Sequence, residues 1–359
     1  MKIIVPKEIK NNENRVGLTP NSVKQLYKAG HEIYVEKNAG IGIGYSNNDY
    51  ELSGASIVDS RSDLFKKGDL IIKVKEPMPE ELEYLNSSHT LFTYLHLAAD
   101  MTQANKLAQT GVRAIAYETI TSKSGNLPLL APMSTIAGQI SIIVGSYFLL
   151  KPNNGLGVMF GDFIGIDKRI VTVIGAGVAG TEAIKKALKN NAYVKVIDLS
   201  EERLNELRGE LGEDNIEYNI SSHKNIIDAL SVSDLVIGSV YVLGKEAPKV
   251  ITKDMIAVMK EGSVIVDISI DQGGCIETSK PTTHDDPVFI KKGVVHYCVT
   301  NMPGAVPLTS TLALNQATLP YILRLSDGVE KALENDTHFA AGLSIENGKI
   351  VHPALQNNF

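Results

Sequence analysis

The feature that most constrains the fold is the glycine pattern in "RIVTVIGAGVAG". Gly175, Gly177 and Gly180 form G-x-G-x-x-G between a β-rich run and the helix-forming stretch "TEAIKKALKN". In such a strand–turn–helix unit, the first glycine permits a tight turn, the second lets the backbone approach a pyrophosphate and the third allows close packing. The helix N-terminus then supplies N–H groups for the anion. The pattern predicts a dinucleotide-binding unit that begins near the middle of the chain.

An acidic residue after the next β-rich run narrows the choice of cofactor. Asp198 ends "VKVID", 18 residues after Gly180. A carboxylate there can accept hydrogen bonds from the ribose hydroxyls, and its charge would repel a 2′-phosphate, which favours NAD(H) over NADP(H). Arg203, on the following helix, is either an adenosine contact or a solvated charge, so use of NADP(H) stays open at this point. The alternative to a cofactor site is a glycine turn that binds nothing, which the flanking strand and helix disfavour.

Short β-rich runs alternate with helix-length amphipathic stretches in two blocks of the sequence. Because parallel strands need crossover connections, this alternation predicts parallel α/β sheets. We expect strands at 2–5, 32–36, 70–75, 90–95 and 112–118 in the first block. In the second block we expect six strands, at 170–174, 193–198, 216–220, 234–239, 263–268 and 294–298, which match the doubly wound nucleotide fold. The later stretch "LSIENGKIVH" predicts a hairpin that turns at Asn347 and Gly348.

Composition excludes several classes of function. The 359 residues, 43% hydrophobic, suffice for two domains with cores, and a net charge of -6 disfavours nucleic acid as a partner. The longest apolar run, 140–150, is shorter than the roughly 20 residues of a membrane helix and predicts a buried helix. "MKIIVPKEIK" has no apolar signal segment. Cys275 and Cys298 indicate neither a disulfide framework nor a metal site. We therefore expect no metal, no membrane and a cytoplasmic setting.

Four polar residues are predicted at the carboxyl ends of strands, where open α/β sheets bind ligands. Arg15 follows the first strand, Lys75 ends "LIIKVK", His96 ends "TLFTYLH" and Asp271 follows the fifth strand of the second block. Each alone fits a plainer interpretation as a solvated charge, a structural histidine or a turn former. Their shared placement favours a site in which two cations hold a small carboxylate while a histidine and an aspartate move protons.

Seven segments give the chain a resemblance to the alanine dehydrogenase family, which also includes the NAD-binding subunit of proton-translocating transhydrogenase. They cover essentially the whole length: "VPKEIKNNENRVGLTP", "KVKEP", "LFTYLHLAAD", "LPLLAPMSTIAGQ", "VIGAGVAG", "VDISIDQGGCIETSKPTTHDDP" and "NMPGAVPLTST". The resemblance implies an α/β fold of two domains, with a Rossmann dinucleotide-binding domain inserted into a discontinuous parallel α/β substrate domain. The implied boundaries are 1–130 and 306–359 for the substrate domain and 131–305 for the NAD-binding domain, with linking helices near 134–150 and 309–325.

The same resemblance implies NAD-dependent, reversible oxidative deamination of L-alanine to pyruvate and ammonia, in a homo-hexamer. Arg15 and Lys75 would hold the substrate carboxylate and carbonyl, His96 and Asp271 would be the catalytic residues, and Asn301 would lie near the nicotinamide and substrate. The expected cofactor-binding positions are Ser134, Gly175, Gly177, Val178, Gly180, Asp198, Arg203, Ser221, Val240, Tyr241, Ile268, Ser269, Ile270, Asp271, Lys280, Val299, Thr300, Asn301 and Met302.

Three other functions remain open on the residues alone. An NAD-binding subunit of a transhydrogenase would normally accompany membrane helices, and the sequence contains no run long enough for one. A dehydrogenase of another amino acid, of the lysine or saccharopine type, would handle a longer side chain, and no added acidic cluster appears in the motifs. A non-enzymatic NAD-binding sensor would bind the nucleotide without producing NADH.

Overall fold

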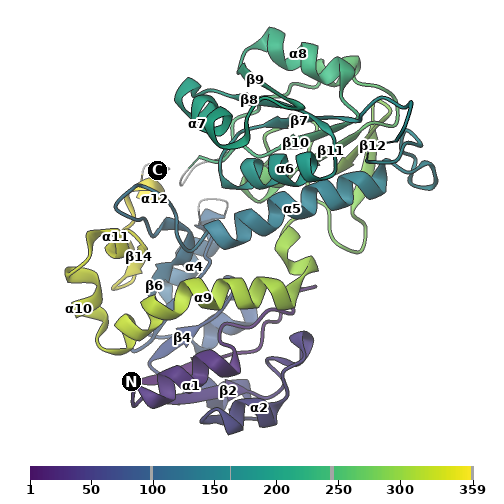
Figure 1. The fold of residues 1–359 in the computed structure, drawn as a ribbon. Helices are drawn as coiled ribbons and strands as arrows, with labels where there is room; N and C mark the ends of the chain where they lie inside the picture. Colours follow the sequence, from purple (N-terminus) through teal and green to yellow (C-terminus); the bar gives the residue numbers. More distant parts are fainter. Residues whose placement is uncertain (98–99, 162, 243–245, 357–359) are drawn as a thin grey trace. The chain divides into compact units, whose positions relative to one another are not determined.

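The chain forms two compact units in the computed structural model, which describes residues 1–97, 100–161, 163–242 and 246–356 (Figure 1). The first, here called the outer unit, comprises Met1–Met133 and Gly304–Phe359, and the second, the inserted unit, comprises Ser134–Pro303. Two long helices lie near the two crossings, α5 at Ala131–Phe148 and α9 at Pro307–Ser326. The predicted fold class, a dinucleotide-type domain inserted into a discontinuous α/β domain, is confirmed.

The described part of the inserted unit contains a seven-stranded sheet in the order β12-β13-β11-β10-β7-β8-β9. All six predicted strands are present and parallel. The strand β12 was not predicted; it pairs antiparallel with β13 through a two-residue turn in which Lys292 and Gly293 both have positive φ, as a type I′ turn requires. The bounds are β7 Ile170–Ile174, β8 Tyr193–Asp198, β9 Ile216–Ile220, β10 Leu235–Gly238, β11 Val264–Asp267, β12 Val288–Lys291 and β13 Val294–Tyr297.

Helices cover both faces of this sheet because successive strand side chains point to opposite sides. Val236 packs with residues of α8 (His223–Val232) in one buried cluster. Its neighbour Leu235 faces α5. Gly145 of that helix lies so close to Leu235 that an added Cβ would be 2.6 Å from a Leu235 methyl carbon. Helices α6 (Val178–Lys189) and α7 (Glu201–Leu211) connect the strands on the β7–β9 side. The inserted unit is therefore doubly wound (Figure 1).

The outer unit is built on an eight-stranded sheet in the order β15-β14-β6-β5-β4-β1-β2-β3. Strands β1 to β6 are parallel, and their order reverses direction between β1 and β4, which makes that position the switch point where such sheets bind ligands. The predicted hairpin turn at Asn347 and Gly348 is confirmed, whereas β3 was not predicted. The bounds are β1 Lys2–Val5, β2 Glu32–Glu36, β3 Ala55–Val58, β4 Leu70–Ile72, β5 Thr90–Thr93, β6 Arg113–Ala116, β14 Leu343–Glu346 and β15 Lys349–Ile350.

Three strands of the outer unit end earlier than predicted, and for two of them a buried carboxylate is the reason. The strand expected at 70–75 ends at Ile72, because Glu8 accepts hydrogen bonds from the backbone N–H groups of Val74 and Lys75, at 2.7 and 3.3 Å. The strand expected at 90–95 ends at Thr93, because Glu118 takes the next free N–H groups. The strand expected at 112–118 likewise covers only 113–116. Side-chain acceptors replace the backbone ladder at this edge.

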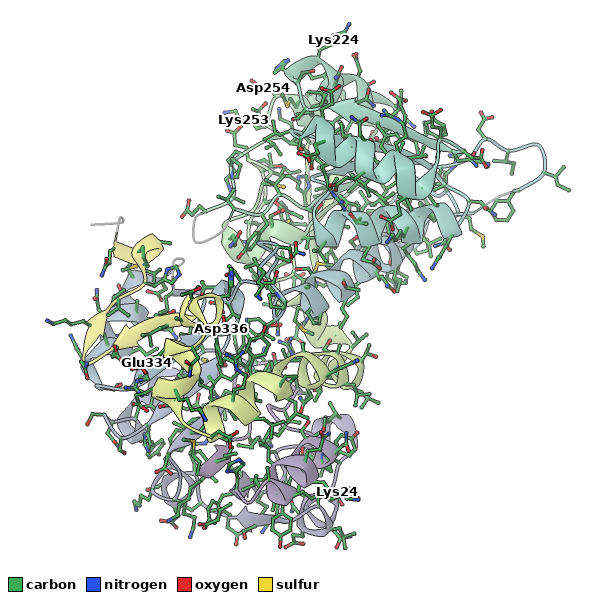
Figure 2. The ribbon with its side chains drawn as sticks, turned by 60° about the vertical axis from the view of Figure 1, so that its left-hand side comes forward. Lys24, Lys224, Lys253, Asp254, Glu334 and Asp336 are labelled. Atoms are coloured by element: carbon green, nitrogen blue, oxygen red, sulfur yellow. The ribbon has the colours of Figure 1, made fainter. Side chains whose placement is uncertain are left out.

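Helices pack on both faces of the outer sheet as well. Helices α3 and α4 belong to a buried cluster that includes Leu64, Phe65, Ala104 and Leu107, while α1 lies beside α9 (Figure 1). Charged side chains such as Lys24 and Glu334 project outward (Figure 2). The bounds are α1 Pro20–Lys28, α2 Asn47–Leu52, α3 Arg61–Phe65, α4 Met101–Gln109, α10 Val329–Glu334, α11 Thr337–Ala340 and α12 Pro353–Gln356.

No helix in the described part of the chain is long and apolar enough to cross a membrane. Within the same residues, no group of three or more histidine, cysteine, aspartate and glutamate side chains could hold a metal ion.

Candidate active site and dinucleotide site

The glycine loop between β7 and α6 has the geometry that a pyrophosphate needs. Gly175 has φ +92°, and a Cβ there would lie 2.7 Å from the carbonyl oxygen of Ser239. A Cβ on Gly180 would lie 1.9 Å from the carbonyl oxygen of Gly175, so this glycine permits close helix–strand packing. A Cβ on Gly177, in contrast, would meet no atom within 4 Å. The space beside Gly177 is open to a ligand, and the residues present therefore fit a dinucleotide.

Asp198 and Arg203 both support this glycine loop. Asp198, at the end of β8, accepts hydrogen bonds from the N–H groups of Ala176 and Ser200, at 2.6 and 2.9 Å. Arg203 donates to the carbonyl oxygen of Ala176 and to the hydroxyl of Thr181, both at 2.9 Å. The Arg203 side chain is about one-third exposed, at 33%. The loop is thus held from the β8 side, with the Asp198 carboxylate where a ribose would approach.

Most of the other predicted cofactor positions lie at the carboxyl edge of the inserted sheet. They follow β9, β10, β11 and β13, or begin α6: Val178, Ser221, Val240, Tyr241, Ile268, Ser269, Ile270, Asp271, Val299, Thr300, Asn301 and Met302. Two lie elsewhere: Ser134 is in the first turns of α5, and the exposed Lys280 places its ammonium 4.6 Å from the centre of the Phe289 ring. The hydroxyl of Ser269 is buried and accepts or donates no hydrogen bond among the described residues.

The loop after β11 carries the predicted catalytic residue Asp271. This exposed carboxylate accepts the N–H of Asn301 at 3.2 Å, which ties the loop after β11 to the loop after β13. Asp267, the last residue of β11, is fully buried. Its carboxylate accepts hydrogen bonds from the Ser279 hydroxyl at 2.7 Å and from the Cys275 N–H at 3.1 Å. Burial raises the pKa of Asp267, and these hydrogen bonds oppose the rise. Asp267 therefore anchors the segment from which Asp271 projects.

In the outer unit, Arg15 lies buried beside Glu13 at the carboxyl end of β1. Its Nε and one terminal nitrogen donate to the two Glu13 carboxylate oxygens, at 2.7 and 2.5 Å, in a bidentate pair. The other terminal nitrogen is 3.2 Å from the sulfur of Met133. Burial disfavours the charge, but the hydrogen bonds and charge of Glu13 outweigh it and raise the pKa of Arg15. Arg15 is thus a fixed guanidinium with one end next to a weak acceptor.

Lys75 lies after β4 with its side chain only 6% exposed. Its ammonium is 3.8 Å from one carboxylate oxygen of Glu76, and this oxygen accepts no hydrogen bond among the described residues. The other Glu76 oxygen accepts from Lys10 at 2.5 Å. Burial opposes ionisation of Glu76, but the charges of Lys75, Lys10 and His96 hold its pKa at about 2. Glu76 is therefore an anion shared by two lysines and the histidine.

His96 lies after β5, half-buried, and its ring stacks on Tyr94 with centroids 5.8 Å apart and planes 10° apart. Tyr94 is buried, which raises the pKa of its phenol, while the positive charge of Arg15 lowers it. Tyr94 thus stacks on His96 and interacts electrostatically with Arg15, and Glu76 interacts electrostatically with both His96 and Lys75. The outer unit brings together Arg15, Lys75 and His96, whereas Asp271 and Asn301 belong to the inserted unit.

Comparison with known proteins supports this description. The family described as "Alanine dehydrogenase/PNT, N-terminal domain" matches residues 4–137, and "Alanine dehydrogenase/PNT, C-terminal domain" matches residues 141–353. An alanine dehydrogenase of Halomonas elongata is 48% identical over 100% of this chain and 97% of its own length. One of Bacillus subtilis is 48% identical over 99% of this chain and 94% of its own length.

The chain belongs to the alanine dehydrogenase/PNT family. A solved structure of that family, an L-alanine dehydrogenase, superimposes with a TM-score of 0.94 at 45% identity, covering 99% of this chain and 98% of its own. A transhydrogenase from Sinorhizobium meliloti has a TM-score of 0.82 at 22% identity, covering 99% of this chain and 100% of its own, and shares the fold.

Four residues at the candidate sites of this alanine dehydrogenase/PNT family member were missed by sequence reasoning. Glu13, Glu76 and Glu118 contact Arg15, Lys75 and His96, and Ser239 donates to the carbonyl oxygen of Gly175 at 2.7 Å. Glu13 and Glu76 stand close to predicted basic residues in the sequence, at "ENR" and "KE", but that spacing does not distinguish a buried partner from a surface charge, and Glu118 lies 22 residues from His96.

We expect Glu76→Gln to lower the free energy of unfolding at pH 7 by at most roughly 3 kcal/mol. An unfolded glutamate has a pKa of about 4.3, above the value of about 2 in the folded protein. The stabilisation is therefore complete above the unfolded value and is lost as pH falls through it toward the folded value. Urea unfolding of both proteins between pH 7 and pH 3 measures the difference, and a gap that stays constant over this range would contradict it.

Proposed function

We propose that the protein is an NAD-dependent alanine dehydrogenase, which converts L-alanine, NAD⁺ and water to pyruvate, ammonium, NADH and a proton, and catalyses the reverse reaction. The observation that carries the proposal is the match, over essentially the whole chain at 48% identity, to curated alanine dehydrogenases. The cluster of Arg15, Lys75 and His96 in the outer unit gives that match a chemical basis.

The bound nicotinamide would supply hydride acceptance in one direction and hydride donation in the other. The inserted unit would hold it through the glycine loop and the N-terminus of α6, which fit the pyrophosphate. Asp198 would accept hydrogen bonds from the ribose hydroxyls, and its charge disfavours the 2′-phosphate of NADP(H). The buried hydroxyl of Ser269 would provide a hydrogen bond at the same edge of the sheet.

Arg15 would bind the carboxylate of pyruvate and Lys75 its keto oxygen. Glu13 fixes the plane of the Arg15 guanidinium, so that the nitrogen next to Met133 can donate to a substrate carboxylate, a stronger acceptor than the thioether. Lys75 would donate to the carbonyl oxygen and polarise it. One carboxylate oxygen of Glu76 lies 3.8 Å from the Lys75 ammonium and attracts it.

His96 would act as the acid–base group. L-alanine enters as an ammonium ion, and its nitrogen lone pair must be freed before the Cα–H bond breaks, so a base has to take one proton. Imidazole suits this exchange near neutral pH. Asp271 would orient the water that adds to the imine carbon and stabilise the cationic intermediates before ammonia leaves. Asn301, whose N–H is bonded to Asp271, would contact the substrate and nicotinamide end.

We also propose that the protein is a cytoplasmic homo-hexamer. The family resemblance supports this assembly, and so does an exposed apolar surface on α5 and the segment after it. Ile143 and Tyr147, four residues apart on α5 and so on one face of it, are 55% and 56% exposed, and Met159 and Ile164 follow the helix at 65% and 106%; an exposed apolar helix face is typical of protein contacts.

The proposal is tested with purified protein, NAD⁺ and a panel of L-amino acids, by the absorbance of NADH. We expect turnover with L-alanine, slower turnover with glycine or L-serine because a small pocket separates such side chains by only about 1–3 kcal/mol, and none with L-lysine. Faster turnover of a longer amino acid would indicate a related dehydrogenase. Binding of NADH without turnover of any amino acid would indicate a sensor and would overturn the proposal.

A further inference from the structure

The backbone of His96 adopts a conformation that L-residues with a side chain avoid. Its φ is +49°, in the left-handed region, whereas the other described non-glycine residues with positive φ are asparagines and Lys292. This conformation is strained for an ordinary residue because the Cβ approaches the following carbonyl oxygen. Such strain persists only where the surroundings enforce it, and it gathers at functional sites. Some contact must therefore hold His96 in place.

That contact is the carboxylate of Glu118. One of its oxygens accepts the N–H of His96 at 2.6 Å and the N–H of Leu95 at 3.1 Å, and its other oxygen lies 3.2 Å from the same Leu95 nitrogen. Glu118 is 8% exposed, so these hydrogen bonds are shielded from water. Charge-assisted hydrogen bonds of this kind are roughly twice as strong as neutral ones, and Glu118 makes them to two successive N–H groups, which holds the left-handed backbone.

The pairing of β6 with β5 places Glu118 next to the backbone of Leu95 and His96. Strand β6 pairs with β5, with Ala116 opposite Thr93, and both strands end directly after this pair. The chain then enters a short 3₁₀ turn, Tyr117–Thr119, in which the buried Tyr117 donates its hydroxyl to the carbonyl oxygen of Lys73 at 3.1 Å. That anchor sets the direction of the turn, and the next side chain, Glu118, faces the backbone that follows β5.

We infer that Glu118 is a positioning residue for His96: its buried carboxylate holds the backbone at 95–96 so that the imidazole is presented at the carboxyl edge of the outer sheet, stacked on Tyr94. The inference rests on the proposed function in that His96 is the acid–base group. Glu118 does not reach the reacting atoms in this role. It acts only through the backbone N–H groups of Leu95 and His96, so it determines the position of the imidazole.

The experiment compares Glu118→Ala with Glu118→Gln and with Asp336→Ala. Asp336 is a matched control, because its carboxylate also accepts two backbone N–H groups, of His338 and Phe339, at 3.0 and 3.1 Å, and its side-chain partner is Arg324, which is not one of the predicted site residues. We expect Glu118→Ala to lower kcat for L-alanine by about 10–100-fold, with the dissociation constant of NADH unchanged. Glu118→Gln, which keeps the shared oxygen acceptor, should retain kcat within a few-fold. Asp336→Ala should lose stability and keep kcat.

Isotope effects separate mispositioning from loss of folded protein. If the base is displaced, proton transfer becomes slower than hydride transfer, so Glu118→Ala should show a larger solvent deuterium effect on kcat and a smaller effect of deuterium at the alanine Cα. A protein that is merely less folded keeps both isotope effects at their wild-type values, and that result would overturn the inference. So would a kcat in Glu118→Ala equal to that of the wild type.

A crystal structure of Glu118→Ala tests the positioning without turnover. We expect the φ of residue 96 to leave the left-handed region and the imidazole to leave the Tyr94 ring. An unchanged His96 would refute the role of Glu118 even in an active enzyme. If the wild-type protein instead turned over no amino acid, the proposed function would fail, while the structure of the variant would still decide what holds His96.

Discussion

Replacing His96 by alanine is expected to lower kcat for L-alanine oxidation by about 10²–10⁴-fold, the usual contribution of a positioned acid–base group. The variant lacks the imidazole that stacks on Tyr94, so the substrate ammonium would have to lose its proton to bulk water. The dissociation constant of NADH should stay unchanged, since the predicted cofactor positions all lie in the inserted unit. Stopped-flow turnover and fluorescence titration measure the two quantities.

A matched histidine provides the control for this prediction. His31 directly precedes β2, at the amino edge of the outer sheet and therefore opposite the edge that carries His96, and His31→Ala should keep wild-type turnover. Turnover of His96→Ala within a few-fold of the wild type would remove His96 from the mechanism. Weakened NADH binding in His96→Ala would point to a general structural defect.

Replacing Arg15 by methionine is expected to have two large effects. The KM for pyruvate should rise by about 10²–10³-fold, because one or two charge-assisted hydrogen bonds of about 1.5–3 kcal/mol each are lost. The free energy of unfolding should fall by about 3–5 kcal/mol, because Glu13 stays buried without the guanidinium that it binds at 2.5 and 2.7 Å. Steady-state kinetics of pyruvate reduction and urea unfolding measure the two effects.

The double variant Arg15→Met with Glu13→Gln separates binding from folding. Removing both charges should recover most of the lost stability, because a buried ion pair contributes little more than an uncharged pair of similar shape. The KM for pyruvate should nevertheless stay high. A double variant that binds pyruvate as tightly as the wild type would show that Arg15 holds Glu13 and not the substrate.

The fold was predictable from the sequence because its signals are local and repeated. The glycine loop at 175–180 lies between a strand and a helix, and the alternation of strands and helices appears in both units, so the parallel sheets and the inserted dinucleotide domain could be derived. The strand β12 escaped because its residues are half-exposed and its turn, at Lys292 and Gly293, carries neither asparagine nor aspartate.

The candidate site was predictable only in its basic and catalytic members, whose assignment stays a prediction. Arg15, Lys75 and His96 stand at predicted strand ends, and that rule named them. Their acidic partners could not be predicted, because sequence spacing does not show which acidic residues are buried. Glu13 lies two residues before Arg15, whereas Glu118 lies 22 residues after His96 and is brought to it by the pairing of β5 with β6. A contact of this second kind needs the register of β5 against β6.

The carboxylates of Glu8 and Glu118 end two neighbouring strands, and the residues just past those ends are Lys75 and His96. The sheet itself therefore does not dictate where these two side chains stand. A change at either glutamate could reposition one of them while the strand register, which the rest of the core depends on, stays as it is. In this architecture, the placement of two substrate-site side chains depends on two acidic residues and not on the hydrogen-bond ladder of the sheet.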